Sequence, residues 1–352
     1  MRTLVLYILF FVPLIAFSQI GGTTIYEFVN TPKSARENAL GGNIISIYDG
    51  DVSLLLKNPA LMDSSYSGEF AGGWASLHVT KTETGQGNFA YSYTMKHKVS
   101  FTGGINFVSY GKFKHYDENE NYLGSFLATD YEIFLGAAYE IFPRLSVGAY
   151  IKPILSYYET YSSYGLLQDY AVAYKDTSQA FTATIKFANV GWQLKRYTPG
   201  NKEPIPFSID LGISKKLKHA PLRITATYEG LNRFDLSYDK ILEDEKNVLN
   251  QYDEEKNGGF EKFTTNFFKH IHLAGEVMLF KSLSLNIGYN FRKAYELSFG
   301  EKKKAVGLCL GFNVKISDFS ISYGWAKQHI SSGTNYFTFT ANVNNLYNQF
   351  KK

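Results

Sequence analysis

Apolar and polar residues alternate in fourteen separate segments of this chain, each about ten residues long. In one of the clearest, Leu283, Leu285, Ile287, Tyr289 and Phe291 fall on one face, opposite Ser284, Asn286, Gly288 and Asn290. Successive side chains of a β-strand point to opposite sides, so each segment is predicted to be a strand with one apolar face. About ten residues is also the length of a tilted strand that crosses a bilayer. A soluble sandwich alternates in the same way, so the period alone does not distinguish the two.

The connections between the predicted strands separate these two architectures. The strands cover approximately 67–79, 87–96, 98–109, 129–141, 144–156, 163–174, 179–189, 206–217, 221–231, 268–280, 283–293, 304–316, 318–327 and 333–343. Short connections near His97, 142–143, 175–176, 218–220, 281–282 and Ser317 alternate with longer ones at 80–86, 110–128, 157–162, 190–205, 232–267, 294–303 and 328–332. Short periplasmic turns and longer external loops are typical of bacterial outer-membrane barrels, whereas Greek-key sandwiches scatter their long connections. The chain is therefore predicted to be all-β, a 14-stranded antiparallel transmembrane β-barrel in the bacterial outer membrane.

The stretch from Gly21 to Met62 lacks the alternation of the later chain. Ser34 and Glu37 have the spacing of a capping box, which predicts a short helix over 35–40 that ends at Gly41 and Gly42. A second short helical turn over 52–56 is predicted to end at the Asn58-Pro59-Ala60 triplet, because Pro59 disfavours a helical conformation at Asn58. We interpret this compact unit as a hatch, or plug, in the barrel lumen. The candidate hatch motif comprises Ser34, Glu37, Gly41, Gly42, Asn58, Pro59 and Ala60.

The first eighteen residues have the pattern of a secretory signal peptide. Arg2 precedes an apolar run over 4–12, and the small-residue pattern Ala16-Phe17-Ser18 follows. The apolar run is shorter than the ~20 residues of a spanning helix, which makes a membrane anchor the less favoured alternative. The predicted organisation is a signal peptide over 1–18, the hatch over 19–66 and the barrel over 67–352.

No arrangement of residues indicates catalysis, a cofactor or a metal. A nucleophile with an adjacent base is missing, and Cys309, the single cysteine, is expected to pack in the wall. His270 and His272 share a strand face, but a third metal ligand is not visible. A net charge of +4 is too small to argue for nucleic acid. We therefore expect a protein that is not an enzyme and carries no cofactor.

Two other features leave alternatives open. Tyrosines 157, 158, 161 and 164 lie near strand ends, where they could belong to an aromatic belt at the membrane interface or form a carbohydrate-binding platform. The loop over 232–267 carries nine acids and five bases, and its apolar residues predict a short helix within 239–255. A solvated cap is the favoured interpretation of this loop, and a partner surface or a divalent-ion bridge to lipopolysaccharide is the alternative.

Long stretches of this chain resemble a known family. The start GGTTIYEFVNTPKSARENALGGNIIS, followed by NPALM, is similar to the start of the PorV/PorQ family, whose barrels resemble the long-chain fatty-acid transporter FadL. Four further stretches point to the PorQ branch of this family. They are FVSYGKFKHYDENENYLGSF from Phe107, NVGWQLKRYTPGNKEPIPFSIDLGISKKLKHAPLR from Asn189, LNRFDLSYDK from Leu231 and ISYGWAKQHISSGTNYFTF from Ile321. The resemblance implies a fourteen-stranded barrel with a hatch in its lumen, in agreement with the strand count made from the alternation.

The resemblance also implies a function in type IX secretion. Its members belong to a cell-surface attachment complex with a sortase-like protease, a PorV-like barrel and a PorZ-like protein, which couples exported cargo to lipopolysaccharide. This chain is then expected to be a non-enzymatic subunit of that complex. The alternative is a FadL-type channel for hydrophobic small molecules, which needs an apolar route between plug and wall.

Overall fold

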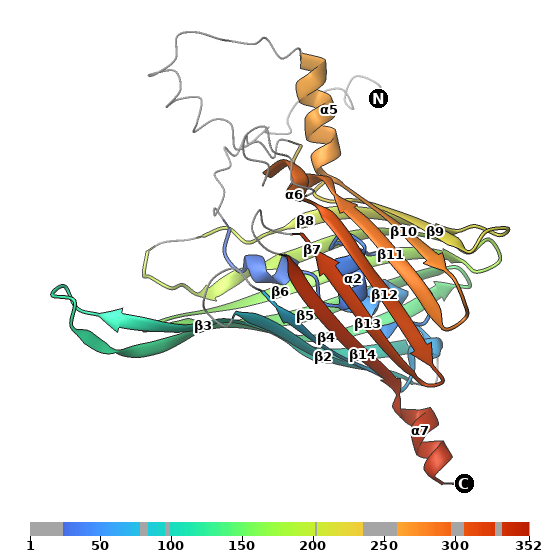
Figure 1. Cartoon of the computed structure of the whole chain (residues 1–352), viewed down its shortest axis with the longest axis horizontal. Coiled ribbons are helices and arrows are strands. Elements are labelled where there is room, and N and C mark those ends of the chain that lie inside the picture. The colour runs from blue at the N-terminus through green and yellow to red at the C-terminus, as the bar shows by residue number, and fades with distance from the viewer. Residues whose placement is uncertain are drawn as a thin grey trace, which may run out of the picture.

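The computed structural model describes residues 24–77, 84–95, 99–200, 203–234, 259–296, 306–327 and 333–351. The predicted signal peptide over 1–18 and the predicted helix within 239–255 lie outside these residues. Fourteen strands form one closed antiparallel barrel, in which each strand pairs with its neighbours in sequence and β1 pairs with β14 (Figure 1). The strands are β1 (Glu69–Ser76), β2 (Gly85–Thr94), β3 (Val99–Tyr116), β4 (Tyr122–Phe142), β5 (Leu145–Tyr158), β6 (Tyr161–Asp176), β7 (Phe181–Lys195), β8 (Ser208–Lys216), β9 (Leu222–Tyr228), β10 (Ile271–Met278), β11 (Leu283–Asn290), β12 (Leu308–Ile316), β13 (Phe319–Ala326) and β14 (Thr334–Asn342). The predicted fold class and all fourteen predicted strands are confirmed.

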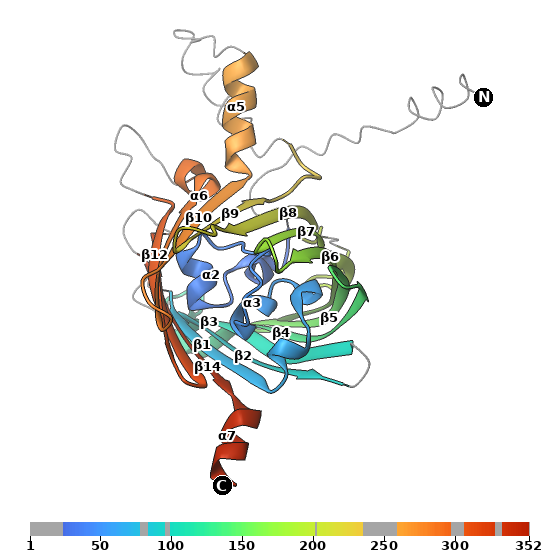
Figure 2. The same cartoon turned by 90° about the vertical axis from the view of Figure 1, so that its right-hand side faces the viewer.

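The N-terminal segment before the barrel lies inside it, as Figure 2 shows for α2 and α3. We call residues 24–66 the plug. Its elements are η1 (Glu27–Asn30), α2 (Ala35–Ala39), α3 (Val52–Leu55), η2 (Pro59–Leu61) and η3 (Ser64–Tyr66), where η denotes a 3₁₀ turn. Within the described ranges three further helices, none of them predicted, lie outside the lumen: α5 (Gly259–Lys269), α6 (Phe291–Glu296) and α7 (Val343–Phe350). None of the helices in the described ranges is long and apolar enough to cross a membrane.

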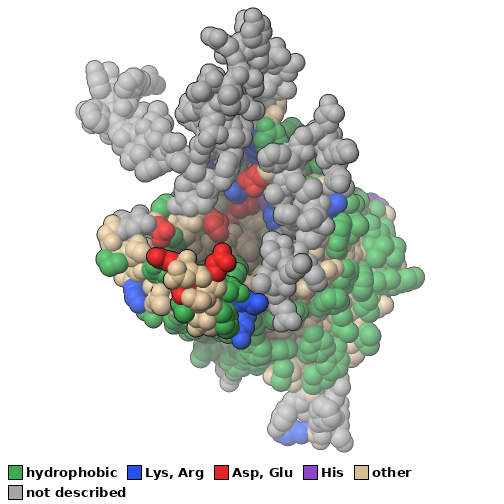
Figure 3. Space-filling view, turned by 60° about the vertical axis from the view of Figure 1, so that its left-hand side comes forward, with side chains coloured by type: hydrophobic (Ala, Val, Ile, Leu, Met, Phe, Trp, Pro, Cys, Tyr) green, Lys and Arg blue, Asp and Glu red, His purple; other side chains and the backbone are tan. Residues whose placement is uncertain are grey.

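The barrel wall separates apolar from polar side chains. Large apolar residues on its outer face are exposed, among them Trp74, Phe101, Leu135, Ile151, Ile213, Leu285, Ile321 and Phe337. Figure 3 shows hydrophobic side chains over the outer wall, with charged side chains gathered around the hollow mouth. Positions that alternate with these are polar and buried inside, as Ser100, Thr102, Asn106, Thr225 and Ser322 are. A closed barrel with an apolar outer face and a polar interior is the architecture of bacterial outer-membrane proteins, so the chain is placed in that membrane.

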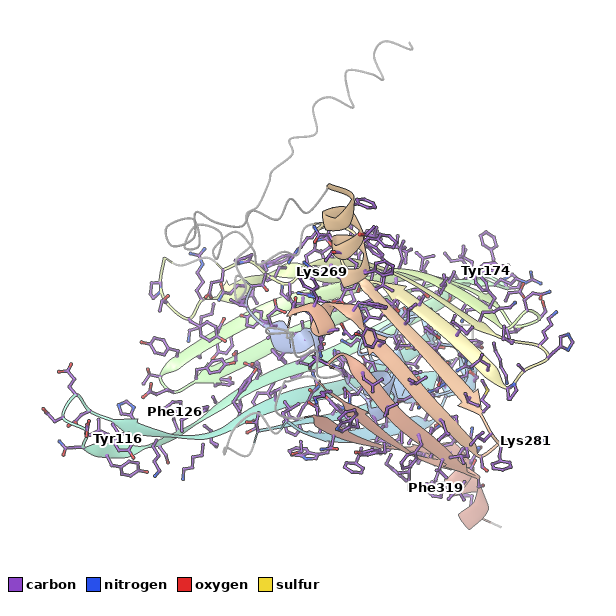
Figure 4. The ribbon with its side chains drawn as sticks, turned by 45° about the horizontal axis from the view of Figure 1, so that its top comes forward. Tyr116, Phe126, Tyr174, Lys269, Lys281 and Phe319 are labelled. Carbon is purple, nitrogen blue, oxygen red and sulfur yellow. The ribbon has the colours of Figure 1, made fainter. Side chains whose placement is uncertain are left out.

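Two of the predicted long loops are wrong. The connection expected over 110–128 consists mostly of strand, because β3 continues to Tyr116 and β4 begins at Tyr122. The connection expected over 157–162 is a tight turn between Tyr158 and Tyr161. Both hairpins extend past the membrane-facing part of the wall, where paired strands no longer need an apolar outer face. Figure 4 shows the β3–β4 hairpin, with Tyr116 and Phe126, projecting beyond the other strands.

The two ends of the barrel differ. Short turns, with Tyr174, Lys281 and Phe319 near them, lie at one end together with the start of β1 and the end of β14 (Figure 4). Helices α5 and α6 and the long β3–β4 hairpin lie at the other end. Since short turns are periplasmic in barrels of this kind, we refer to these as the periplasmic and external ends.

Candidate functional site

The plug helix α2 begins and ends as the sequence predicts. Oγ of Ser34 accepts a hydrogen bond from the amide of Glu37 at 3.1 Å. The return bond of the capping box differs, because the Glu37 carboxylate accepts from the amide of Lys33, at 2.7 Å, rather than from Ser34. Gly41 and Gly42 have φ values of +104° and +102°, and the amide of Gly42 donates to the carbonyl of Glu37 at 3.0 Å. This is a Schellman ending, which needs residues without a side chain.

The Asn58-Pro59-Ala60 triplet fixes the plug to the wall. Oδ1 of Asn58 accepts from the amide of Ala60 at 2.9 Å, and its Nδ2 donates to the carbonyl of Ile45 at 2.5 Å. The hydroxyl of Ser146 on β5 donates to the carbonyl of Ala60 at 2.5 Å. Pro59 occupies the first position of η2, where its missing N–H costs nothing. The triplet therefore ends one plug turn, starts the next and contacts β5.

Glycines in the wall let the plug backbone approach. A methyl group added at Gly288 on β11, Gly311 on β12 or Gly324 on β13 would overlap atoms of α2 or of the residue after it. A methyl group at Gly148 on β5 would lie 2.5 Å from the carbonyl carbon of Pro59. Such glycines inside a strand mark a close approach of another backbone. We call the wall surface at these four glycines the glycine seat, because the plug backbone packs on it.

One cluster of buried charges joins α2 to the periplasmic half of the wall. Nη2 of Arg36 lies 2.5 Å from Asp49 and 2.7 Å from Glu276 on β10. Nη1 of Arg36 lies 3.0 Å from Asp51. Arg223 on β9 contacts the same two acids, with Nη1 at 2.5 Å from Asp49 and 2.8 Å from Glu276. Burial would raise the pKa of Asp49, but Arg36 and Arg223 outweigh that effect and hold the pKa below its usual range.

A second cluster joins the plug to strands β4–β7. Nζ of Lys33 lies 2.6 Å from Glu132 on β4. Nζ of Lys152 on β5 lies 2.6 Å from Asp169 on β6, and Nζ of Lys186 on β7 lies 3.2 Å from the same carboxylate. All five side chains are buried. Buried charges are tolerated when they are paired and hydrogen-bonded, so this cluster fixes the plug rather than leaving the lumen open.

These wall charges were not identified from the sequence. Glu132, Lys152, Asp169, Lys186 and Glu276 lie within predicted strands, on the faces opposite the apolar residues. A charged residue at the middle of a membrane-crossing strand is a signal that its side chain points into the lumen. That signal predicts that the side chain points into the lumen, but it does not predict which residue the side chain contacts.

The cavities between plug and wall have polar walls. A cleft of about 350 Å³ opens at the periplasmic end, lined in part by Arg36, Asp49, Glu69, Arg223 and Lys315. A cavity of about 20 Å³ lies deeper, among charged residues that include Lys33, Lys57 and Lys186. Both cavities therefore offer polar, water-compatible surfaces between plug and wall.

The candidate metal pair occupies other roles. His270 lies just before β10, where its Nδ1 is 2.6 Å from the carbonyl of Glu229. His272 lies 3.1 Å from the carbonyl of Gly41 through Nδ1 and 2.7 Å from the Glu229 carboxylate through Nε2. His272 therefore connects the plug to the residue that follows β9, whereas His270 contacts the carbonyls of Glu229 and Phe234. Among the described residues, no group of three or more His, Cys, Asp or Glu side chains could hold a metal ion.

The tyrosine cluster is divided between the two faces of the wall. The rings of Tyr157 and Tyr164 contact each other on the outer face, at a centroid distance of 6.1 Å. Tyr158 and Tyr161 lie on the opposite face and line a groove of about 380 Å³ near the external end. The strand alternation produces this division, which the sequence analysis did not anticipate.

Comparison with known proteins supports the barrel fold. Neither protein-family models nor curated proteins give a match. Among solved structures, the Pseudomonas putida toluene transporter TodX matches with a TM-score of 0.50 and 12% identity, over 88% of this chain and 96% of TodX. A TodX deltaS2S3 mutant, described as a monoaromatic hydrocarbon channel, gives a TM-score of 0.50 and 12% identity, over 88% and 97%. A Pseudomonas aeruginosa FadL homologue gives a TM-score of 0.44 and 9% identity, over 89% and 98%. The chain thus has a fold of the TodX type.

Proposed function

We propose that the chain is an outer-membrane channel of the FadL/TodX type that admits small hydrophobic molecules. The observation that carries this proposal is a break in the ladder between β4 and β5. Residue pairs are formed at Glu132–Ile154 and again at Leu135–Ile151, but not at the two positions between them. Pro153 lies in this gap and has no N–H to donate. It is exposed on the outer, lipid-facing side of the wall.

Apolar residues lie directly inside this break. Phe134, which pairs with Gly104 on β3 but with no residue of β5, belongs to a buried cluster with Tyr150 of β5 and with Leu55 and Leu61 of the plug. Lys152, which precedes Pro153, is also buried at this break and pairs with Asp169. The proposed entry route for an apolar molecule therefore runs along the Phe134 side of the break. The fold shared with the toluene transporter TodX supports the same proposal. Because buried ion pairs and apolar clusters join the plug to the wall, passage to the periplasm requires the plug to shift.

Uptake by a deletion strain tests the channel. Radiolabelled toluene should enter cells that carry the intact gene faster than cells that lack it. Replacing Pro153→Val restores a backbone donor, closes the ladder and should reduce uptake. Pro143→Val, in the turn of the same hairpin, is the matched control and should leave uptake unchanged. Equal uptake with and without the gene would exclude the channel.

A second candidate is the non-enzymatic subunit of a type IX attachment complex. Its support is the sequence resemblance to the PorV/PorQ family, together with the buried ion pairs that hold the plug in the closed barrel. In this proposal the barrel holds a sortase-like protease, a PorV-like barrel and a PorZ-like protein at one membrane patch, near lipopolysaccharide. Such tethering raises the effective concentration of these partners relative to one another, commonly to about the millimolar range for short tethers.

The same deletion strain distinguishes the two candidates. The attachment proposal expects normal cargo synthesis, impaired cargo attachment at the cell surface, and co-purification of the barrel with the three partners. The channel proposal expects normal cargo attachment and lost toluene uptake. Measuring both quantities in one strain assigns the function.

A further inference from the structure

An aromatic groove lies at the external end of the barrel, between the β3–β4 and β5–β6 hairpins. Its walls are Tyr110, Phe113, Phe126, Ala128, Tyr158, Glu159 and Tyr161, and its volume is about 380 Å³. The groove is shallow and open along one side, with almost entirely apolar walls. Figure 4 shows Phe126 on the hairpin that projects past the rest of the wall. The groove begins where Tyr110 packs against the plug cluster of Ile25, Tyr26 and Phe28, and it extends outward along the hairpin.

Strand geometry explains why these rings gather on one side. A bulge between Ser109 and Gly111 in β3 leaves Tyr110 unpaired, and Gly111 has a φ of +90°. Beyond the bulge, Phe113 pairs directly with Phe126 across the hairpin. Their rings stack with centroids 5.5 Å apart and an interplanar angle of 20°. The stacked pair forms one flat wall of the groove.

The tyrosines of the groove are held in place by a buried carboxylate. The hydroxyls of Tyr110 and Tyr158 donate to Oδ2 of Asp130, at 2.7 and 2.8 Å. The hydroxyl of Ser156 donates to the other oxygen of Asp130. Asp130 is 3% exposed, and the two rings lie 5.7 Å apart. A carboxylate with three hydroxyl donors fixes both rings before any ligand arrives, which lowers the entropic cost of binding.

The edge of the groove is polar. Glu159, in the β5–β6 turn, pairs with Nδ1 of His115 near the tip of β3. Both side chains are partly exposed to solvent. They place a hydrogen-bond acceptor and a ring nitrogen beside the aromatic walls.

We propose that this groove binds a saccharide through ring stacking. The apolar face of a pyranose, made of C–H groups, can lie on the aromatic walls while its hydroxyls reach Glu159, His115 and water. A hydrocarbon fits an open groove poorly, because the face turned away from the rings stays in water and contributes no hydrophobic free energy. A sugar needs only one apolar face covered. Because the groove is open along one side, it favours a saccharide over a hydrocarbon.

Direct binding to the purified barrel tests the proposal. The probe is fluorescently end-labelled, lipid-free polysaccharide released by mild acid from lipopolysaccharide of the producing bacterium. Fluorescence anisotropy is recorded in a detergent without a sugar headgroup, because a maltoside would compete. The intact barrel should bind the probe. The Phe113→Ala/Phe126→Ala variant should bind it about tenfold more weakly or not at all, because the stacked wall is lost.

The matched control is Tyr157→Ala/Tyr164→Ala. These two rings lie on the outer face of the same β5–β6 hairpin and do not line the groove. Binding should be unchanged in this variant, and both variants should keep the gel migration of the unboiled barrel.

Three results would overturn the proposal. One is no binding of the polysaccharide by the intact barrel, and another is an equal loss in both variants. The third is binding of toluene or decanoate that disappears in the Phe113→Ala/Phe126→Ala variant, which would assign the groove to apolar molecules. The proposal stands apart from the channel and attachment proposals, since neither deletion-strain assay measures this binding.

Discussion

Nη2 of Arg36, on the plug helix, lies 2.7 Å from the Glu276 carboxylate in the periplasmic half of strand β10. The two side chains are 5% and 2% exposed, so both charges depend on each other and on Asp49 and Arg223 for compensation. Contacts of this kind make the plug part of the barrel rather than a loose insert.

Removing Arg36 should therefore loosen the plug. In an Arg36→Met variant, Glu276 and Asp49 lose a buried partner, at a cost of about 3–5 kcal/mol. Limited proteolysis from the periplasmic side should cleave residues 24–66 faster than in the intact protein. Arg292→Met is the control, because it breaks the more exposed Arg292–Glu296 pair and should cost about 1 kcal/mol or less. Equal protection of the plug in both variants would contradict the ion-pair account.

Gly324 should not accept even one methyl group. Its added carbon would overlap the carbonyl of Ala35, so Gly324→Ala should displace α2 from the wall. Hydrogen exchange at residues 34–42 should increase. Gly275→Ala on β10 is the matched control, since its methyl would meet only Cγ2 of Ile287 at an ordinary 3.5 Å. A Gly324→Ala barrel with unchanged exchange would show that the seat has spare room.

The helix ending at Gly41 and Gly42 offers a test of backbone conformation. Replacing both with valine places β-branched residues at positive φ, a strain of about 1–3 kcal/mol per position. The plug should become more sensitive to protease, while the barrel still inserts, because closure depends on the strands. Pro59→Leu should act in the same direction by loosening the turn that contacts β5. Unchanged protection in both variants would argue against a structural role for the motif.

Acid should weaken the plug through Asp49. The pKa of this carboxyl in the folded protein lies below its value in the unfolded chain. Its stabilising contribution is therefore complete above the unfolded pKa of about 4 and decreases as pH falls further. Burial raises the pKa of Glu37, which acts in the opposite direction.

An Asp49→Asn variant separates the two effects. Hydrogen exchange of the plug, corrected for the intrinsic rate at each pH, should rise between pH 4 and pH 2 in the intact protein. In the variant the plug should be less protected throughout, without the additional acid step. A loss of protection already complete at pH 5 would contradict the assignment to Asp49.

The closed barrel should show heat-modifiable migration. An unboiled sample should run at a different position from a boiled one on a denaturing gel, because closed barrels resist detergent until they are heated. Identical migration of the two samples would be inconsistent with fourteen strands closed by the β1–β14 pair.

Alternation was sufficient to locate every strand, because each one separates a lipid face from a lumen face. The alternation did not predict the strand residues that extend beyond the membrane, because there the outer face is no longer apolar. In the outer part of β3, Lys112 and Lys114 occupy the outward positions, so the pattern lost its apolar face although the pairing continues. Helix α5 was missed because the helix of the 232–267 loop was expected within 239–255, and residues 268–269 were assigned to a strand that begins only at Ile271.

The caps and turns of the plug could be predicted from the sequence because their signals are local. Ser34 caps a helix three residues away, and Asn58 bonds to Ala60. The charged contacts were not predictable, because Arg36 and Glu276 are 240 residues apart in sequence. Three acids and two cations meet in that cluster, and only the barrel register brings them together.

The glycine seat has a consequence for the order of folding. Asn38 bonds to the carbonyl of Gly324, 286 residues later, and the amide of Ala35 bonds to Thr338, 303 residues later. Helix α2 packs on β11–β14, so its binding surface is incomplete until the last two strands have been synthesised and exported. Those strands also complete the β1–β14 closure. The docking of α2 and the final seam of the wall thus depend on the same strands, and a chain truncated before β13 would leave α2 without most of the wall on which it packs.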